Sequence, residues 1–360
     1  MKTVFILGAG ASRQAGAPLM SDFLDFAEAL LRQKLIEAKD DFDNVFNALA
    51  ELQAVHAKSF LDLDNIEILF GAIEMAQLIG KLGERDREEI AKLRESIITL
   101  IFKTLEYSIK FPVRDQYVFP PRPYEDFFKT LSSARSKTIP ISPHEFAFLT
   151  FNYDLTLDFS LHHSGYNFDY CLSDKSEEKD AHIQKVPYLK LHGSINWGTC
   201  EKCGQIIPRY TTEAHFDLYS GRSQHVVYNL GSTLHATKHC GKPLKGPPIL
   251  VPPTWNKTGY HEQLANVWKK AAAELSTAEN IFVIGYSLPE TDSFFRYLYA
   301  LGSESPIRIK RFWVFNPDIE GGVEQRFRDL IGRGIENRFE YFKVKFQDAI
   351  PIIGRALNEM

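Results

Sequence analysis

The stretch over residues 146–154 constrains the fold of this chain more than any other. An apolar run over 146–149 predicts a short buried strand. It gives way to polar residues spaced two apart, Thr150, Asn152 and Asp154. Because residues two apart in an extended strand point to the same side, we expect a hydroxyl, an amide and a carboxylate to face one space. In open α/β sheets ligands bind outside the carboxyl ends of the strands, so this strand end is a candidate binding site.

Other strand-like runs also end in polar or glycine-rich turns. The strands and the residues of their turns are Thr3–Leu7 with Gly8, Ala9, Gly10 and Ser12; Tyr188–Leu191 with His192; Asn280–Gly285 with Ser287; and Arg311–Phe315 with Asn316 and Asp318. Ile249–Val251 is expected to rejoin the sheet. Since these strands alternate with helical patterns, we predict an α/β fold: a Rossmann-like, mostly parallel sheet with helices on both faces.

The 360 residues allow one large domain or two ordinary ones. Residues 1–20 and 111–360 are expected to form the Rossmann-type domain. Apolar stripes at helical spacing within 21–110 predict a helical insertion or subdomain. Residues 198–246 contain three of the four cysteines and little helical periodicity, and we expect a small Cys-containing module there.

Charge and hydropathy narrow the function classes. A net charge of -4 argues against a nucleic-acid binder driven by phosphate contacts. No apolar run reaches about 18 residues, so we expect no membrane span. The chain shows no signal-peptide pattern, and its Cys-x-x-Cys pair favours metal or redox chemistry over disulfides. We therefore expect a cytoplasmic protein.

Each polar turn, taken alone, also has a purely structural interpretation. The glycine turn lacks the third glycine of the dinucleotide fingerprint, because Arg13 stands at that position, and it could be a tight turn that binds nothing. Asn152 and Asp154 could satisfy their own backbone. His192 could be a core histidine that only hydrogen-bonds. Five such strand ends in one chain favour the functional interpretation.

The set of motifs, in this order, resembles the sirtuin family: Gly-Ala-Gly-x-Ser, Thr-x-Asn-x-Asp, His-Gly, Cys-x-x-Cys, Gly-x-Ser and a late Asn. It is more similar to the divergent bacterial branch, which includes NAD-cleaving proteins of antiphage defence, than to the protein deacylases. The segment 16–21 lacks the Phe and Arg of the deacylase loop. Val251–Trp255 stands in place of the deacylase substrate-channel segment.

The resemblance implies an NAD+ glycohydrolase that uses NAD+ as its substrate. By resemblance, Asn152 holds the nicotinamide ribose or the attacking water, Asp154 orients the nicotinamide side, and His192 is the general base. The glycine turn cradles the pyrophosphate. The adenosine half is held by Gly285, Ser287 and Asn316, with Asp318 as a further candidate. The divergent branch also implies gating through a homo-oligomer or a defence partner protein.

The cysteine segment resembles the sirtuin zinc module. Cys200, Cys203 and Cys240 supply three thiols, and tetrahedral zinc needs a fourth ligand. Thr237 stands where the fourth cysteine is expected, so His239 or His235 is the substitute. A structural zinc ion is expected; the alternative is a reduced-cysteine loop without metal.

Two other function classes remain open. An NAD-dependent protein deacylase or ADP-ribosyltransferase would share the pocket but needs an acceptor groove. A non-catalytic module that senses NAD or ADP-ribose needs only the binding residues, and the presence of both Asn152 and His192 argues against it.

Overall fold

The computed structural model describes residues 1–54, 61–137, 145–173, 185–209, 215–218, 225–229, 237–244, 248–251, 258–319 and 321–359. The chain divides into two compact units. Unit 1 is Met1–Ala15, Phe111–Gly193 and Trp255–Met360, and unit 2 is Gly16–Lys110 and Ser194–Thr254. Unit 2 thus contains both the helical segment and the cysteine segment. The domain limits expected from the sequence stay a prediction.

Unit 1 is built on a seven-stranded parallel sheet, which confirms the predicted α/β class. In spatial order its strands are β17 (Phe339–Phe342), β16 (Arg311–Phe315), β15 (Asn280–Ile284), β1 (Lys2–Leu7), β4 (Glu145–Thr150), β6 (Val186–Lys190) and β5 (Phe168–Asp169). The central strands are largely apolar and, apart from Lys2 and Glu145 at their starts, buried, because helices cover both faces.

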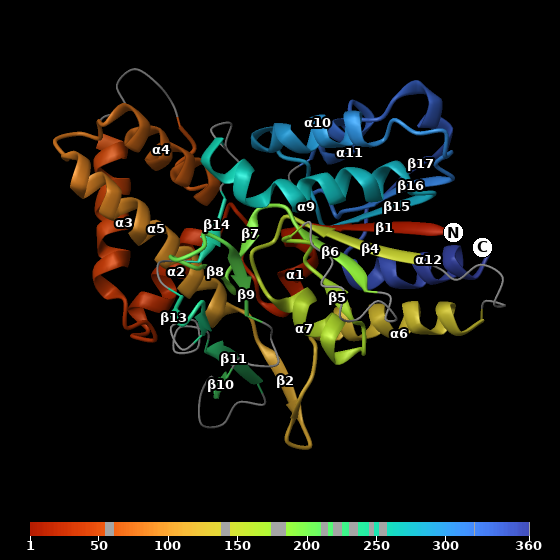
Figure 1. Ribbon diagram of the computed structural model, residues 1–360, viewed down its shortest axis with the longest axis horizontal. Coiled ribbons are helices and arrows are strands. Elements are labelled where there is room, and N and C mark those ends of the chain that lie inside the picture. Colours follow the sequence, from red (N-terminus) through yellow and green to blue (C-terminus); the bar gives the residue numbers. More distant parts are fainter. Residues whose placement is uncertain are drawn as a thin grey trace. The chain divides into compact units, whose positions relative to one another are not determined.

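Helices lie on both faces of this sheet (Figure 1). One face carries α9 (Thr258–Ser276), α10 (Ser293–Gly302) and α11 (Val323–Arg328), and the other carries α6 (Arg122–Lys137), α7 (Thr156–His163) and α12 (Phe346–Asn358). The short α1 (Ala9–Ser12) follows β1, and the hairpin β2 (Phe111–Arg114) and β3 (Tyr117–Val118) precedes α6. Aromatic rings fill the core: Phe5 stacks on Phe148 with ring centroids 5.4 Å apart and meets Phe127 edge-on at 5.1 Å.

The strand order places the predicted turns at one edge. Strands β4, β6 and β5 extend the sheet on one side of β1, and β15, β16 and β17 extend it on the other, so the topology switches at β1. The ladder sets five residues at one level, in the spatial order Lys190, Thr150, Leu7, Ile284 and Phe315. Each predicted polar turn begins within two residues of this level. This is the edge where open α/β sheets bind ligands.

The expectation that Ile249–Val251 rejoins the sheet is wrong. Strand β14 (Ile249–Leu250) is not among the seven strands. The run is only three residues long, and prolines flank it at 247, 248, 252 and 253. Proline has no N–H to donate to a ladder, so such a segment is a poor inner strand.

Unit 2 combines helices with short hairpins. Its helices are α2 (Phe23–Arg32), α3 (Lys39–Ala54), α4 (Ile66–Ile79) and α5 (Arg87–Ser108), and its strands include β8 (Trp197–Thr199), β9 (Ile206–Pro208), β10 (His215–Leu218), β11 (His225–Asn229), β12 (Lys238–His239) and β13 (Lys242–Pro243). The start of α5 forms a capping box, in which Asp86 accepts from Glu89 N and the Glu89 side chain accepts from Asp86 N. In the described residues no helix is long and apolar enough to cross a membrane.

Two glycine turns of unit 1 touch each other at the switch point. The Gly10 N–H donates to Gly285 O at 2.9 Å. A Cβ on Gly8 would lie 2.5 Å from Tyr286 Cα, and a Cβ on Gly10 would lie 2.8 Å from Gly285 O. Gly285 has φ +63, and its Cβ would lie 2.3 Å from Ala11 N. The packing of one turn on the other therefore accounts for these glycines before any ligand is considered.

We predict that Gly285→Ala destabilises the protein by about 3 kcal/mol or more, since it combines left-handed backbone strain with a clash against backbone that cannot move away. Gly165→Ala is the matched control, because Gly165 has φ +74 and nothing within 4 Å of its Cβ position. It should lose only about 1 kcal/mol, the cost of the backbone conformation alone. Urea unfolding measures both values. Equal losses would contradict the packing account.

Candidate functional site

Asn152 is fixed against the glycine turn of unit 1. Its Nδ2 donates to Gly8 O at 3.0 Å and to Ser12 Oγ at 3.3 Å. Its backbone N–H donates to Thr150 Oγ1, and Thr150 Oγ1 donates to Leu7 O at 2.8 Å. In the part of the chain that the structure describes, no donor meets Asn152 Oδ1. The amide is thus oriented with its acceptor oxygen unused.

Ser12 is fully buried below this amide. Its hydroxyl lies 3.0 Å from Tyr124 Oη. Burial, together with the nearby Asp154 carboxylate, raises the pKa of Tyr124 well above its usual value, so its hydroxyl stays neutral. Asn152, Ser12 and Tyr124 therefore form one hydrogen-bonded row from α6 to the end of β4.

Asp154 holds the start of α7. Its Oδ1 accepts from Thr156 N at 2.8 Å, and the side chain is buried. This contact is the local backbone role that aspartate commonly has at a turn before a helix. Lys190 of the neighbouring strand β6 holds the backbone of the same turn.

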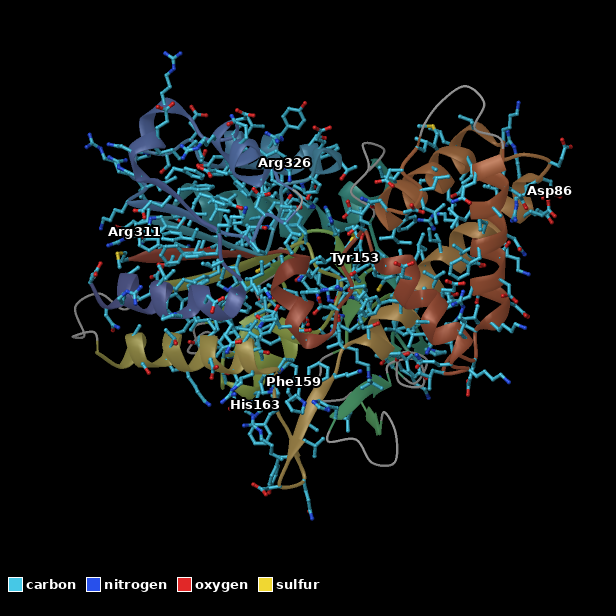
Figure 2. All side chains as sticks on the ribbon, turned by 180° about the vertical axis from the view of Figure 1, so that it is seen from behind. Asp86, Tyr153, Phe159, His163, Arg311 and Arg326 are labelled. Carbon is cyan, nitrogen blue, oxygen red and sulfur yellow. The ribbon has the colours of Figure 1, made fainter. Side chains whose placement is uncertain are left out.

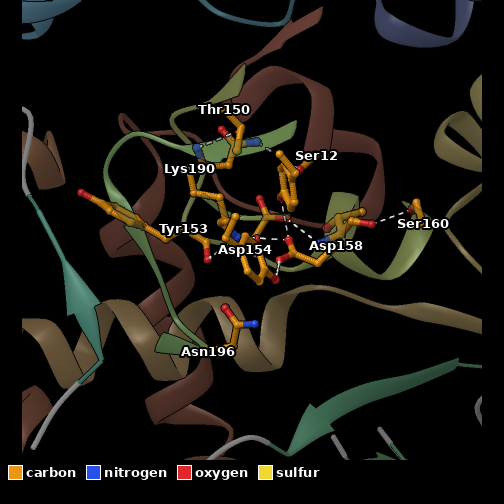
Figure 3. Close-up of polar contacts among 12 residues, drawn as sticks. Ser12, Thr150, Tyr153, Asp154, Asp158, Ser160, Lys190 and Asn196 are labelled. Atoms are coloured by element: carbon orange, nitrogen blue, oxygen red, sulfur yellow. Dashed lines mark hydrogen bonds and ion pairs between the residues drawn. The ribbon is translucent and has the colours of Figure 1, made fainter. Parts of the chain in front are cut away.

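A buried ion pair ties the β4 turn to β6 (Figure 3). Lys190 Nζ lies 3.1 Å from Asp158 Oδ2, and both side chains are fully buried. The same ammonium donates to Asp154 O at 2.6 Å. Asp158 also accepts from Tyr188 Oη at 2.7 Å and from Tyr170 Oη at 2.5 Å. Lys190 stands two residues before His192, and through Asp154 O it also contacts the turn that follows Asn152.

The Asp158 carboxylate also affects its neighbours' protonation. Burial, then the charge of Asp158, raises the pKa of Tyr188 well above its usual value. The hydroxyl therefore remains a donor to the carboxylate. With Tyr170, Tyr188 and Lys190 around it, the buried charge of Asp158 is hydrogen-bonded on both oxygens, which is the condition for an ion pair to persist in a core.

We predict that Asp158→Ala lowers the free energy of unfolding by about 3–5 kcal/mol, because Lys190 would keep a buried charge without its partner. The control is Glu324→Ala, which breaks a surface pair with Arg328 whose two side chains are about half exposed. That change should cost less than about 1 kcal/mol. Chemical denaturation of both variants checks the difference, and a loss at Asp158 as small as the surface value would contradict it.

His192 faces a carboxylate that the sequence analysis missed. Its Nε2 lies 3.3 Å from Asp292 Oδ1, and both side chains are buried. The Phe151 ring meets the imidazole edge-on at 5.1 Å and stacks on Tyr286 at 4.2 Å. Asp292 ends the sequence Pro-Glu-Thr-Asp directly before α10, a position typical of a helix cap. The only sequence signal for a functional role is therefore its closeness to the Ser287 turn.

The turns that follow β15 and β16 are held by hydrogen bonds between side chains and the backbone. Asn316 Nδ2 donates to Tyr286 O at 3.3 Å, and its Oδ1 accepts from Asp318 N at 2.8 Å. Asp318 Oδ1 accepts from Val323 N, the first residue of α11. Arg326, also missed from the sequence, is labelled in Figure 2. It donates from Nε to Ser287 O at 3.0 Å. This corner of the site thus has a cation beside the turn.

The cysteine segment of unit 2 brings four possible ligands together. Ligand atoms of Cys200, Cys203, His239 and Cys240 all lie within 4.8 Å of one another. The first two follow β8, where the Gly204 N–H donates to Cys200 O. His239 and Cys240 stand at the β12–β13 hairpin, whose two-residue turn has φ +50 at Cys240 and φ +80 at Gly241.

The donor set fits zinc. Three thiols and one imidazole are a common tetrahedral combination. The His239 ring, followed by the backbone at Cys203, hydrogen-bonds the Cys200 sulfur and lowers the pKa of this thiol to about 6. Thr237, at the position of the expected fourth cysteine, accepts instead from Arg209 Nη1. His235 lies outside the described residues.

We predict that the purified protein holds one zinc per chain and that Cys203→Ser removes it, because three ligands bind zinc far more weakly than four. Cys171→Ser is the control: Cys171 lies outside the cluster, and burial raises the pKa of its thiol to about 12. Elemental analysis after zinc supplementation checks this. A metal-free wild type would show that the cysteines serve another purpose.

Comparison with known proteins gives resemblance in structure only. No protein-family model and no curated protein matches the sequence. Among solved structures, a Sir2 homologue in complex with ADP-ribose shares 13% identity at a TM-score of 0.42, with 99% of this chain and 92% of that chain covered. A Sir2 homologue in complex with NAD shares 14% identity at a TM-score of 0.42, with 99% and 90% covered. TM-scores this low describe a loose superposition, so residue roles rest on the geometry of this chain.

Proposed function

We propose that this protein is an NAD+ glycohydrolase, which converts NAD+ and water to nicotinamide, ADP-ribose and a proton. One observation carries the proposal: Asn152 and His192 stand just past the carboxyl ends of the adjacent strands β4 and β6, beside the switch point of the sheet. Ligands of open α/β sheets bind at such a place. The substrate class comes from the order of the sirtuin-like motifs in the sequence.

The residues suit bond cleavage at the nicotinamide ribose. The carbon–nitrogen bond breaks toward an oxocarbenium-like state, and nicotinamide leaves as a neutral molecule with the bonding electron pair. Such a reaction needs an oriented water and a base more than a strong nucleophile. The acceptor oxygen of Asn152 would orient the water or a ribose hydroxyl. His192 would take the proton, since imidazole titrates near working pH.

The remaining candidates would hold the rest of the dinucleotide. In this proposal Ala9, Gly10 and Ser12 lie along the pyrophosphate, and Asp154 lies on the nicotinamide side. Gly285, Ser287, Asn316 and Asp318 take the adenosine half. Arg326, bonded to Ser287 O, adds a positive charge beside the adenosine half.

A freely active NAD+ hydrolase would deplete its own cell, so the proposal includes control of activity. We place that control in self-assembly or in a partner protein of an antiphage defence system, as the resemblance to the divergent sirtuin-like branch implies. The helical part of unit 2 is the proposed surface for such contacts.

We predict that the wild-type protein releases nicotinamide and ADP-ribose without any acylated peptide, and that Asn152→Ala lowers kcat by roughly 10²-fold or more while nucleotide binding stays near wild type. Asn358→Ala, an exposed position at the end of α12, is the matched control and should not change kcat. Chromatographic assay of products and calorimetric binding measure the two effects.

Three outcomes would contradict the proposed glycohydrolase activity and indicate another function or another site. Turnover only with an acylated peptide would indicate a deacylase. Tight binding of NAD+ or ADP-ribose without turnover, both in vitro and in cells challenged with phage, would indicate a sensor. Unchanged kcat in Asn152→Ala would place the chemistry elsewhere in the chain.

A further inference from the structure

The contact between His192 and Asp292 joins two elements that are far apart in sequence. His192 follows β6, and Asp292 ends the short 3-10 helix Glu290–Asp292 after β15. Their side chains are only 3% and 1% exposed, and Nε2 lies 3.3 Å from Oδ1. The two atoms are close but not aligned as a hydrogen bond, and such loose alignment is common for catalytic contacts before substrate binds.

Asp292 does not cap the helix that it precedes. It stands at the N-cap of α10, yet its side chain makes no capping hydrogen bond. A capping aspartate typically stabilises its helix by about 1 kcal/mol. Here the carboxylate instead accepts from Tyr286 Oη at 2.5 Å through Oδ2 and faces His192 through Oδ1. The side chain is therefore aimed at the imidazole and held there.

The surroundings hold both groups in place. Tyr286 stacks on Phe151 with an angle of 8° between the rings, and Phe295 meets both rings edge-on. Phe151 in turn packs against the His192 imidazole. These rings keep water away from the pair, which strengthens its electrostatic attraction.

A carboxylate beside one ring nitrogen decides what the other nitrogen can do. The Asp292 carboxylate would repel a lone pair on Nε2, so the proton of the neutral ring is favoured on Nε2. In the neutral imidazole the lone pair then lies on Nδ1, which becomes the base. When Nδ1 takes a proton from water or a ribose hydroxyl, the ring becomes a cation, and the Asp292 carboxylate beside it offsets that buried charge.

We infer that Asp292 is a positioning residue that holds His192 in the Nε2–H tautomer and leaves Nδ1 as the base of the reaction. This inference rests on the proposed function, in which His192 takes the proton. Asp292 contacts His192, and in this proposal it does not touch the substrate. Its loss should therefore lower kcat and leave KM nearly unchanged.

The kinetic test uses Asp292→Asn, which keeps the size of the side chain and an acceptor for Tyr286. We expect kcat to fall by roughly 10²- to 10⁴-fold, the range in which an aspartate that orients a catalytic histidine acts. The matched control is Glu290→Gln, the same chemical change two residues away at an exposed position of the same 3-10 helix. It should keep wild-type kcat. A kcat within about threefold of wild type in Asp292→Asn overturns the inference.

A spectroscopic test does not depend on turnover. Nitrogen-15 NMR of histidine-labelled protein at alkaline pH reports the neutral tautomer of each ring, and the His192 signal is identified by its loss in His192→Gln. We expect the Nε2–H tautomer in wild type and a shift toward Nδ1–H in Asp292→Asn. The Nδ1–H tautomer in wild type, or identical His192 signals in the two proteins, overturns the inference.

The two proposals fail in different ways. If wild type never cleaves NAD+ while the tautomer shift is found, the glycohydrolase is wrong and the His192–Asp292 pair stands as a structural fact. If Asp292→Asn fails to fold, Tyr286→Phe replaces it, because this change removes the hydroxyl bonded to Oδ2 and keeps the ring stack. We then expect a fall in kcat of several-fold at constant KM, and an unchanged kcat overturns the inference.

Discussion

The buried ammonium of Lys190 is the contact on which the geometry of the proposed site depends. It neutralises Asp158 inside the core and donates to the backbone of the turn that follows β4. An ammonium without water must fill its donor positions with protein acceptors, and this turn supplies one. The turn after Asn152 is thereby held by the strand that precedes His192. A polar interaction of the core thus connects the turn after β4 with the strand that precedes His192.

The second constraint is the close packing of two glycine turns at the switch point of the sheet. Gly8 and Gly10 leave no room for side chains because the backbone at Gly285 and Tyr286 occupies that space. The strands β1 and β15 can therefore end side by side. The aromatic ring of Tyr286 reaches past this contact to stack on Phe151, which links the glycine turns to the pocket around His192.

Much of the fold could be predicted from the sequence. Apolar runs located the strands β1, β4, β15 and β16 to within about a residue, because buried parallel strands are continuous in hydrophobicity. The Ile249–Val251 run was misassigned since three apolar residues do not reveal which sheet a strand joins. Asp292 and Lys190 were missed for a related reason: their functional partners are 100 and 32 residues away, and local patterns contain no such information.

The sequence by itself determined the strand ends, the polar residues that follow them and the spacing of the metal ligands, because these depend on local hydrophobicity and chain geometry. Only the tertiary structure decided which polar residues meet. It showed that His239 joins the three thiols, that Lys190 holds the Asn152 turn, and that Asp292 faces His192 instead of capping its helix. The physical reason is that a buried polar group needs a partner, and the partner is chosen by the packing of the whole chain.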